Sequence, residues 1–254
     1  MAEEKQEEKS VETDFKKLRK QAKDGVLKAQ YLLAVKLASG DGVEADAKEA
    51  EKWYRKAAKR DFPPAMNNLA LLHAGEALGA SNPKQAVKWY RKAAELGYAS
   101  AQWNLARHLR SGEGVTPDEE EAIDWTKKAA EQGVAAAQNN MGICCSEGRG
   151  MEADEPQAVE WFRKSAEQGQ FQAQFNLAVR LRDGRGVETD LDGAHNFFLM
   201  AAERGMVGAQ FALANMCANG EGGDKDEQAA TEWYRKAAEQ NHALAQYNLA
   251  LRLV

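Results

Sequence analysis

Hydrophobic and polar positions recur along this chain with a period of 36 residues. Each unit reads A-x-x-W-Y-x-K-A-A-E-x-G, then A-Q-x-N-L-A-x-x-L, and then a glycine-rich link such as SGEGV or DGRGV. The ring that opens the W-Y pair keeps this spacing without a slip, at Trp53, Trp89, Trp125, Trp161, Phe197 and Trp233. Self-similarity at a fixed period of this length is typical of repeat architectures.

Both halves of the unit predict an amphipathic helix. In the second half, helical spacing puts Ala101, Leu105 and Leu109 on one stripe, while Trp103 and Arg107 lie on the opposite side. In the first half, alanines share a stripe with the recurrent tryptophan, and charged residues face away. We therefore interpret the tryptophans as core residues.

The links carry signals for helix ends. Thr116 is the expected N-cap of one helix, with Pro117 at its first position and Glu119 at its third. A glycine follows each A-A-E-x helix end, where a left-handed residue is expected. These glycines are Gly97, Gly133, Gly169 and Gly205.

One helix pair cannot bury its own apolar stripe, so neighbouring pairs must stack into an α-solenoid. We predict an all-α chain of fourteen helices, which begins with a half unit near Thr13 and ends with another at 245–254. The solenoid is expected over residues 14–254, as about six full repeats plus the terminal half repeats. Residues 1–12 hold five glutamates against two lysines and are expected to form an acidic, disordered tail.

The unit resembles the Sel1-like repeat, a relative of the tetratricopeptide repeat. The resemblance rests on A-Q-x-N-L-A, the G-x-G-V link and W-Y-x-K-A-A-E-x-G, and it extends over nearly all of residues 14–254. It implies a right-handed superhelix of antiparallel helix pairs whose A-Q-x-N-L-A helices line a concave face. It also implies a non-enzymatic adaptor, without a cofactor, that holds proteins or peptides. The link at 74–83 departs from the pattern because it lacks G-x-G-V.

Charge and hydropathy narrow the range of partners. The formal net charge of −5 is not basic enough to favour nucleic acid. No apolar run approaches the roughly 20 residues of a transmembrane helix, and the start MAEEKQEEKS is unlike a signal peptide. We expect a protein or peptide ligand, no direct membrane insertion, and a cytoplasmic or other reducing intracellular location.

The three cysteines, Cys144, Cys145 and Cys217, have no metal-like spacing. Cys145 and Cys217 occupy a repeat position that leucine fills in other units, for example at Leu109 and Leu181. We therefore expect small core side chains with reduced thiols. Some Sel1-like proteins are secreted and carry a cysteine pair in each repeat, and the absence of that pattern here favours an intracellular chain.

The residue before the repeat asparagine points away from the core stripe in helical projection, and it is often aromatic. Aromatic surface beside guanidinium groups is a common composition of binding hot spots. The alternative is that these rings only pack against the next repeat. The groove candidates of this type are Tyr31, Trp103, Arg107, Arg110, Phe175, Arg182, Phe211 and Tyr247.

The repeat asparagine itself allows two interpretations. Its amide can bind an extended peptide backbone, as inner-helix asparagines of tetratricopeptide repeats do, or it can form an inter-helix bond that fixes stacking. We favour the inter-helix bond, because a nearly unbroken polar column suits a recurring structural contact. Leu32 and Ala212 interrupt the series, whose members are Asn68, Asn104, Asn140, Asn176 and Asn248.

Two further surfaces are candidates for partners. His195, Leu199 and Met200 form an apolar patch on the outer, convex side, although scattered exposed apolar residues are common. The last helix has no neighbour on the side of Leu249 and Leu253, which predicts end-to-end self-association or a partner helix there.

No nucleophile, phosphate-loop or metal motif is recognisable in the sequence. The leading hypothesis is a scaffold that binds a peptide or protein segment along the concave face. The alternatives are an enzyme, such as a hydrolase, with an unrecognised site, and an interaction domain that uses its ends or convex face.

The repeat count predicts at least about 65% helix, no sheet and an elongated shape in solution. Circular dichroism and small-angle X-ray scattering measure these properties. A compact scattering envelope, or a strand signal in the circular dichroism spectrum, would contradict a solenoid.

Overall fold

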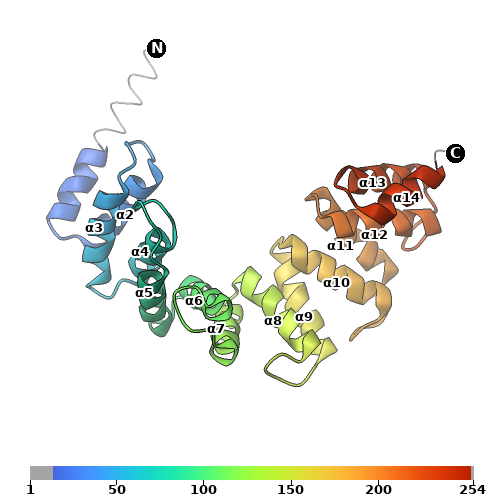
Figure 1. Cartoon of the computed structure of the whole chain (residues 1–254), viewed down its shortest axis with the longest axis horizontal. Helices are drawn as coiled ribbons and strands as arrows, with labels where there is room; N and C mark the ends of the chain where they lie inside the picture. The colour runs from blue at the N-terminus through green and yellow to red at the C-terminus, as the bar shows by residue number, and fades with distance from the viewer. Residues whose placement is uncertain (1–13, 253–254) are drawn as a thin grey trace, which may run out of the picture. The chain divides into compact units, whose positions relative to one another are not determined.

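The chain is built of helices joined by short links. The computed structural model describes residues 14–252, of which 14–23 are helical, and no strand occurs among them (Figure 1). The helices that follow are α2 (Leu27–Ser39), α3 (Ala47–Ala58), α4 (Pro63–Ala74), α5 (Pro83–Glu95), α6 (Ala99–Ser111), α7 (Glu119–Glu131), α8 (Ala135–Glu147), α9 (Glu155–Glu167), α10 (Phe171–Asp183), α11 (Leu191–Glu203), α12 (Val207–Asn219), α13 (Glu227–Glu239) and α14 (Ala243–Arg252). This confirms the predicted all-α repeat of helix pairs.

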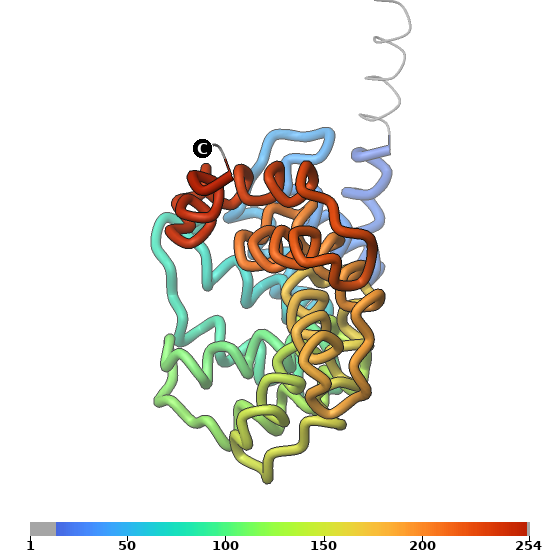
Figure 2. The backbone as a smooth tube through the Cα atoms, turned by 90° about the vertical axis from the view of Figure 1, so that its right-hand side faces the viewer, coloured from blue at the N-terminus to red at the C-terminus, as the bar shows by residue number. Residues whose placement is uncertain are grey.

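Two helix types alternate along the chain. We call the helices that carry the A-Q-x-N pattern AQ helices (α2, α4, α6, α8, α10, α12 and α14) and those that carry the W-Y pattern WY helices (α3, α5, α7, α9, α11 and α13). The chain divides into two compact units, unit 1 (residues 1–128) and unit 2 (residues 129–254), with the boundary inside α7. Within each unit, consecutive helices pack against each other (Figure 2).

The core consists of alanines and of large apolar side chains that the helices contribute. Ala101 and Leu105 of α6 are fully buried, as the helical projection predicts, and Ala86, Ala93 and Tyr90 meet them from α5. A methyl side chain lets two helix backbones approach to the short end of the usual range of about 8–10 Å. The aromatic ring of the neighbouring pair then fills the space that the alanines leave.

The interpretation of the tryptophans as core residues is only partly correct. Trp53 and Trp89 are buried, at 6% and 9% exposed, whereas Trp125 is half-buried. The second residue of the W-Y pair is buried more deeply: Tyr90 and Phe162 are each 1% exposed. The Trp125 indole N–H donates to Glu121 Oε1 at 3.0 Å, and Lys128 Nζ lies 4.1 Å from the ring centroid. An indole has a polar N–H and a ring face that attracts cations, so it fits the edge of a core better than the centre.

The predicted N-cap at Thr116 is wrong. Helix α7 begins at Glu119, and Asp118 caps it by accepting from the Glu121 N–H at 2.9 Å. The Asp118 N–H in turn donates to the carbonyl oxygen of Leu109 at 3.0 Å, which ties the cap to the end of α6. The same pair of bonds recurs every 36 residues, with caps at Asp46, Asn82, Asp118, Asp154, Asp190 and Asp226.

Glycines end the helices largely as the sequence predicts. The four glycines expected after WY helices all have positive φ, between 80° and 89°. The AQ helices α2, α6, α8, α10 and α12 also end in a left-handed glycine, whereas α4 ends at Gly75 with an extended backbone (φ −89°). This exception lies in the link that lacks G-x-G-V.

The second glycine of the G-x-G link is required by close approach as well as by its backbone angle. A Cβ atom on Gly186 would lie 2.4 Å from the carbonyl carbon of Glu155, at the first residue of α9. Gly114 and Gly222 stand in the same relation to Pro83 and Leu191. Each such link therefore presses its backbone onto the start of the preceding WY helix.

All three cysteines are buried, as predicted for Cys145 and Cys217. Burial raises the pKa of the Cys217 thiol. At the C-terminal end Leu249 is half-buried, whereas Leu253 lies outside the described residues. Self-association through this helix therefore stays a prediction. Among residues 14–252, no helix is both long and apolar enough to span a bilayer.

Replacing Gly186 by alanine tests the close approach. Gly186→Ala introduces a clash in addition to backbone strain, so we expect it to lower the free energy of unfolding by roughly 1–3 kcal/mol more than a matched control. The control is Gly169→Ala, because Gly169 also has positive φ (80°) but would place its Cβ atom more than 4 Å from any neighbour. Urea denaturation followed by circular dichroism measures the difference. Equal losses in the two variants would show that the contact with Glu155 is unimportant.

Glu121 joins two WY helices of unit 1. It accepts two hydrogen bonds from the Arg91 guanidinium, one of them from Nη2 to Oε2 at 3.0 Å, and these bonds hold the pKa of the Glu121 carboxyl below its usual range. A carboxyl whose pKa is lower in the folded state contributes stability above its unfolded pKa. That contribution is lost as the pH falls through the folded pKa.

We expect Glu121→Gln to destabilise the protein near pH 7 by about 0.2–1 kcal/mol, because the pair is about one third exposed. The difference from wild type should shrink as the pH falls through the folded pKa of Glu121. Urea midpoints measured between pH 7 and pH 3 test this, with the neighbouring exposed Glu120→Gln as the control. A difference that does not change with pH would rule out the ion pair as its cause.

Candidate functional site

The candidate site is the solvent-facing side of the AQ helices, which we call the AQ face of each unit. In α6 the buried stripe of Ala101, Leu105 and Leu109 faces the core, Trp103 is half-buried and Arg107 is exposed. Consecutive AQ helices lie next to each other within a unit, since Asn104 Nδ2 of α6 donates to Asn67 Oδ1 of α4 at 3.0 Å. Each AQ face is therefore a continuous surface made by neighbouring helices.

The glutamine of the A-Q pattern is structural. Gln102 Nε2 donates to the carbonyl oxygen of Ala94, near the end of the preceding WY helix, at 3.2 Å. Gln174 forms the same bond to Ala166 at 3.3 Å, and both glutamines are buried. This side chain gives the carbonyl a second donor, in addition to the backbone N–H of Gly97 or Gly169. It is therefore not available to a ligand.

The asparagines form bonds between repeats, as the favoured interpretation requires. Asn104 donates to Asn67, and Asn176 Nδ2 donates to Asn139 Oδ1 at 3.1 Å. Asn67 and Asn139 were expected to point outward, but they are 5% and 9% exposed, because they supply the acceptors of this ladder. That expectation was wrong.

The other asparagines are less uniform. Asn68 Nδ2 lies 3.4 Å from the Tyr31 hydroxyl and 3.3 Å from the Tyr54 hydroxyl. Asn140 Oδ1 has a long contact with Cys144 Sγ, at 3.9 Å, and Asn248 is half-buried in α14. A role for the asparagines in peptide binding stays a prediction.

The predicted aromatic residues lie together on the AQ face of unit 2. Phe175 and Phe211 are half-buried, while Tyr247 is 62% exposed. The Phe175 ring lies 5.6 Å from that of Phe198 in an edge-to-face arrangement, and Phe211 is 4.5 Å from the His242 ring. Each ring is thus held from below and presents its other side to solvent.

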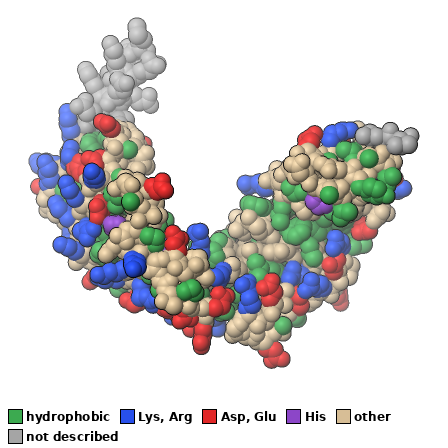
Figure 3. Space-filling model, viewed as in Figure 1, with side chains coloured by type: hydrophobic (Ala, Val, Ile, Leu, Met, Phe, Trp, Pro, Cys, Tyr) green, Lys and Arg blue, Asp and Glu red, His purple; other side chains and the backbone are tan. Residues whose placement is uncertain are grey.

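Apolar side chains between these rings extend the surface. Val179 of α10 and Ile143 of α8 are half-buried, and Leu244 and Leu251 of α14 are 60% and 62% exposed. Hydrophobic side chains accordingly gather over the AQ helices of unit 2 (Figure 3). A contiguous apolar surface of this kind is typical of interaction sites.

In unit 1 the AQ face is polar around α6. Arg107, His108, Arg110, Ser111 and Glu113 line a pocket of about 320 Å³ at the end of this helix. The structure therefore brings the predicted Arg107 and Arg110 together. Burial raises the pKa of Tyr90, whose ring is 5.4 Å from that of His108, to about 12, although the charge of Arg107 opposes the rise.

Tyr31 lies elsewhere in unit 1. Its ring is 5.3 Å from that of Phe62 in an edge-to-face arrangement. Burial raises the pKa of its hydroxyl, although the hydrogen bond from Asn68 opposes the rise.

The predicted groove residue Arg182 is engaged within unit 2. Its Nε lies 2.7 Å from Asp183 Oδ1, and its guanidinium stacks 5.7 Å from the centre of the Phe198 ring. Two residues earlier, Arg180 is 8% exposed and was missed by the sequence analysis. Burial lowers the pKa of Arg180, although Glu155 opposes this shift.

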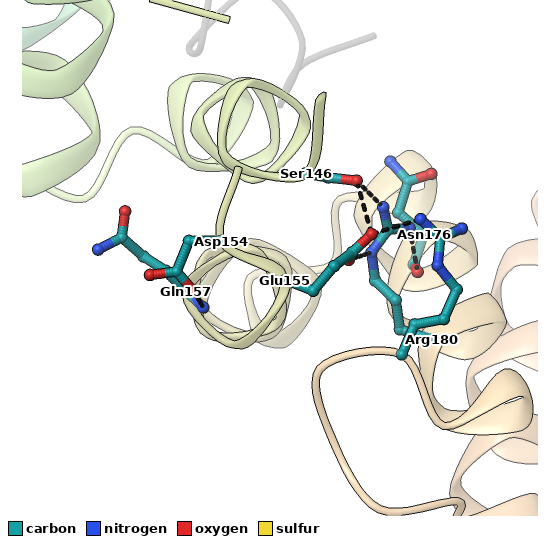
Figure 4. Close-up of polar contacts among 7 residues, drawn as sticks. Ser146, Asp154, Glu155, Gln157, Asn176 and Arg180 are labelled. Atoms are coloured by element: carbon teal, nitrogen blue, oxygen red, sulfur yellow. Dashed lines mark hydrogen bonds and ion pairs between the residues drawn. The ribbon is translucent and has the colours of Figure 1, made fainter. Parts of the chain in front are cut away.

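Arg180 is the centre of a polar network that joins α8, α9 and α10 (Figure 4). Its Nε donates to Glu155 Oε2 at 3.2 Å, its Nη2 to Ser146 Oγ at 2.6 Å and its Nη1 to the carbonyl oxygen of Asn176 at 3.1 Å. The sequence carries a signal for this pair: Glu155 and Arg180 are 25 residues apart, and Glu227 and Arg252, which also pair, have the same separation. The network joins three helices and uses every nitrogen of the Arg180 guanidinium in a bond within the protein.

The outer patch is small in the structure. Met200 is 45% exposed, whereas Leu199 and His195 are half-buried. His195 Nε2 lies 3.9 Å from the buried Cys217 sulfur. A partner at this patch stays a prediction. Among the residues that the structure describes, no three or more His, Cys, Asp or Glu side chains are arranged to hold a metal ion.

Known structures resemble this fold over most of its length. A protective antigen of uropathogenic Escherichia coli strains, which displays an SLR fold, is 37% identical with a TM-score of 0.83; the match covers 92% of this chain and 50% of that one. The chain thus spans half the length of that antigen. A Sel1 repeat protein from Oxalobacter formigenes is 32% identical over 83% of this chain and 84% of that one, with a TM-score of 0.70.

An immunity protein of Pseudomonas aeruginosa is 22% identical over 87% of this chain and 86% of that one, with a TM-score of 0.50. This likeness shows the fold alone. No curated protein sequence matches the chain.

The sequence pattern of the Sel1 repeat matches six consecutive segments, each of which begins with an AQ helix and ends after the following WY helix. They are residues 27–62, 63–98, 99–134, 135–170, 171–206 and 207–242. These segments leave no residue between 27 and 242 outside a repeat. The chain therefore belongs to the Sel1 repeat family.

Proposed function

We propose that this protein is a non-enzymatic scaffold that binds a polypeptide segment on the AQ face of its helices. The observation that carries the proposal is the row of partly exposed rings on adjacent AQ helices of unit 2, Phe175, Phe211 and Tyr247. Aromatic side chains offer large contact areas and dominate many protein interfaces. Sel1 repeat proteins typically mediate protein interactions, which supports the same function.

The opposite surface has a different chemistry. On the WY helices, many exposed side chains are charged, and one pair, Arg55 with Glu51, lies within a helix at 2.5 Å, four residues apart. Such pairs contribute only a few tenths of a kcal/mol and remain solvated. The WY helices therefore offer less apolar contact area to a partner than the AQ face of unit 2.

We further propose a reducing intracellular location. The buried free thiol of Cys217 supports it, because secreted domains commonly pair their cysteines.

Removing two adjacent rings tests the AQ face. We expect Phe211→Gln/Tyr247→Gln to weaken binding about tenfold or more, since a typical hot spot contributes more than about 1.4 kcal/mol. The probe is a phage-displayed library of random peptides, selected on the wild-type protein and then titrated against each variant. The matched control, Leu96→Gln/Met200→Gln, removes two apolar side chains that are 50% and 45% exposed outside the AQ helices.

Circular dichroism at the assay temperature establishes that both variants are folded. Undiminished peptide binding by the folded AQ variant, or an equal loss in the control, would contradict binding on this face.

A further inference from the structure

The pocket at the end of α6 contains unusual chemistry for the AQ surface of this chain. Two guanidinium groups, Arg107 and Arg110, stand three residues apart on the helix and are therefore neighbours on its surface. An imidazole, a hydroxyl and one carboxylate complete the lining, within a volume of about 320 Å³. This volume has room for an entire acidic side chain.

Arg110 has hydrogen-bonding capacity that the protein does not use. Its Nε and Nη2 atoms are buried without a hydrogen-bond partner. The nearest carboxylate oxygen, Glu119 Oε2, is 3.7 Å from Nε, which is too long for a hydrogen bond. A buried donor without an acceptor costs about 1–3 kcal/mol. Both atoms have almost no exposed surface, so the guanidinium must turn toward the pocket before a bound anion can supply the missing acceptor.

The corresponding cations of unit 2 have no such vacancy. Arg182, which is Arg110 shifted by two repeats, contacts Asp183 at 2.7 Å and stacks on Phe198. The guanidinium of Arg180 is bonded through Nε and both terminal nitrogens (Figure 4). The open pair of arginines is therefore a specific feature of α6 and not a consequence of the repeat.

The pocket is held in shape by its own hydrogen bonds. His108 Nδ1 lies 2.9 Å from the Glu113 carbonyl oxygen, to which it donates as the Nδ1–H tautomer. Ser111 Oγ accepts from the Glu113 N–H at 3.3 Å. These bonds fix the link that forms one wall, so a ligand need not order it.

Local charge favours an anion with a single charge. The two arginines face the carboxylates of Glu113 in the pocket and Glu119 beside it, and the C-terminal end of a helix also carries partial negative charge. A phosphate would bring close to two negative charges at pH 7. A carboxylate brings one, and it matches the planar fork of an arginine.

We propose that this pocket binds the carboxylate of an aspartate or glutamate side chain in the polypeptide held by the AQ face, while Trp103 contacts an apolar neighbour of that residue. Trp103 lies one helical turn before Arg107 on the same face of α6. The inference rests on the proposed scaffold function and adds the chemistry of the ligand: an acidic residue next to an apolar one.

Selection of random peptides on phage tests the pocket, with the library joined through the peptide C-terminus so that no free α-carboxylate is present. Wild type should enrich an acidic residue at a fixed place beside an apolar one. Arg107→Gln/Arg110→Gln should lose the acidic preference, keep the apolar one, and bind an enriched peptide about tenfold more weakly. The matched control, Arg163→Gln/Arg235→Gln, removes two exposed charges from WY helices and should behave as wild type.

A double-mutant cycle links the two partners. Replacing the acidic residue of the peptide by its amide should weaken binding to wild type by the same factor and have no further effect on the arginine variant. At equal ionic strength, the α-amide of N-acetyl-L-glutamate, whose side-chain carboxylate is its only charge, should compete for the wild-type pocket better than inorganic phosphate.

Three results would overturn the assignment. The arginine variant could retain the acidic preference, phosphate could compete better than the α-amide of N-acetyl-L-glutamate, or wild type could enrich apolar peptides without an acidic position. The last result would leave the scaffold function standing and remove only the pocket. If wild type enriched no peptide, the proposed function would fail together with the pocket.

Discussion

The structure depends on the close packing of alanine-lined helix faces between neighbouring repeats. Ala50, Ala86, Ala122, Ala158, Ala194 and Ala230 are all fully buried at the same place in successive WY helices. A larger side chain there would push the helices apart, and the ring beneath would lose its contacts. Because no pair can bury this face alone, each repeat is stabilised mainly by its neighbours.

Two side chains place each helix pair on that packed surface. The aspartate or asparagine cap starts the WY helix and binds the end of the preceding AQ helix, as Asp118 does with Leu109. The glutamine of the next AQ helix then binds the end of the WY helix, as Gln102 does with Ala94. Polar residues that look like surface positions in the sequence therefore fix the turns, which is why they are not candidates for ligand binding.

The residues that hold the fold together are different from the residues that are exposed to a ligand. The alanines, caps, glutamines and link glycines are committed to folding, whereas Trp103, Arg107, Phe175 and Tyr247 retain exposed surface. The two AQ faces also differ in chemistry: the described part of unit 2 presents rings and aliphatic side chains, and unit 1 presents an arginine pocket beside a tryptophan. A repeated backbone can thus display different binding groups without a change of fold.

The sequence by itself determined the helix pairs, their number and the residues of the core stripe, because a 36-residue period and helical spacing act locally and repeat in every unit. It also indicated which side chains of α6 and α10 face solvent. The sequence did not reveal three details of the hydrogen bonding and burial. They are the N-cap at Asp118 instead of Thr116, the inward position of Asn67 and Asn139, and the place of Trp125 at the edge of the core.

Only the tertiary structure decided which arginines have donors available to a ligand. Each nitrogen of the Arg180 guanidinium has an acceptor, and Arg182 lies 2.7 Å from Asp183, whereas Arg110 has only a 3.7 Å ion pair with Glu119 and two nitrogens without acceptors. Sequence spacing places a side chain on one face of its own helix. Whether the polar atoms of that side chain find hydrogen-bond partners depends on groups a few ångströms away on other helices and links. Those groups come close only when the repeats stack.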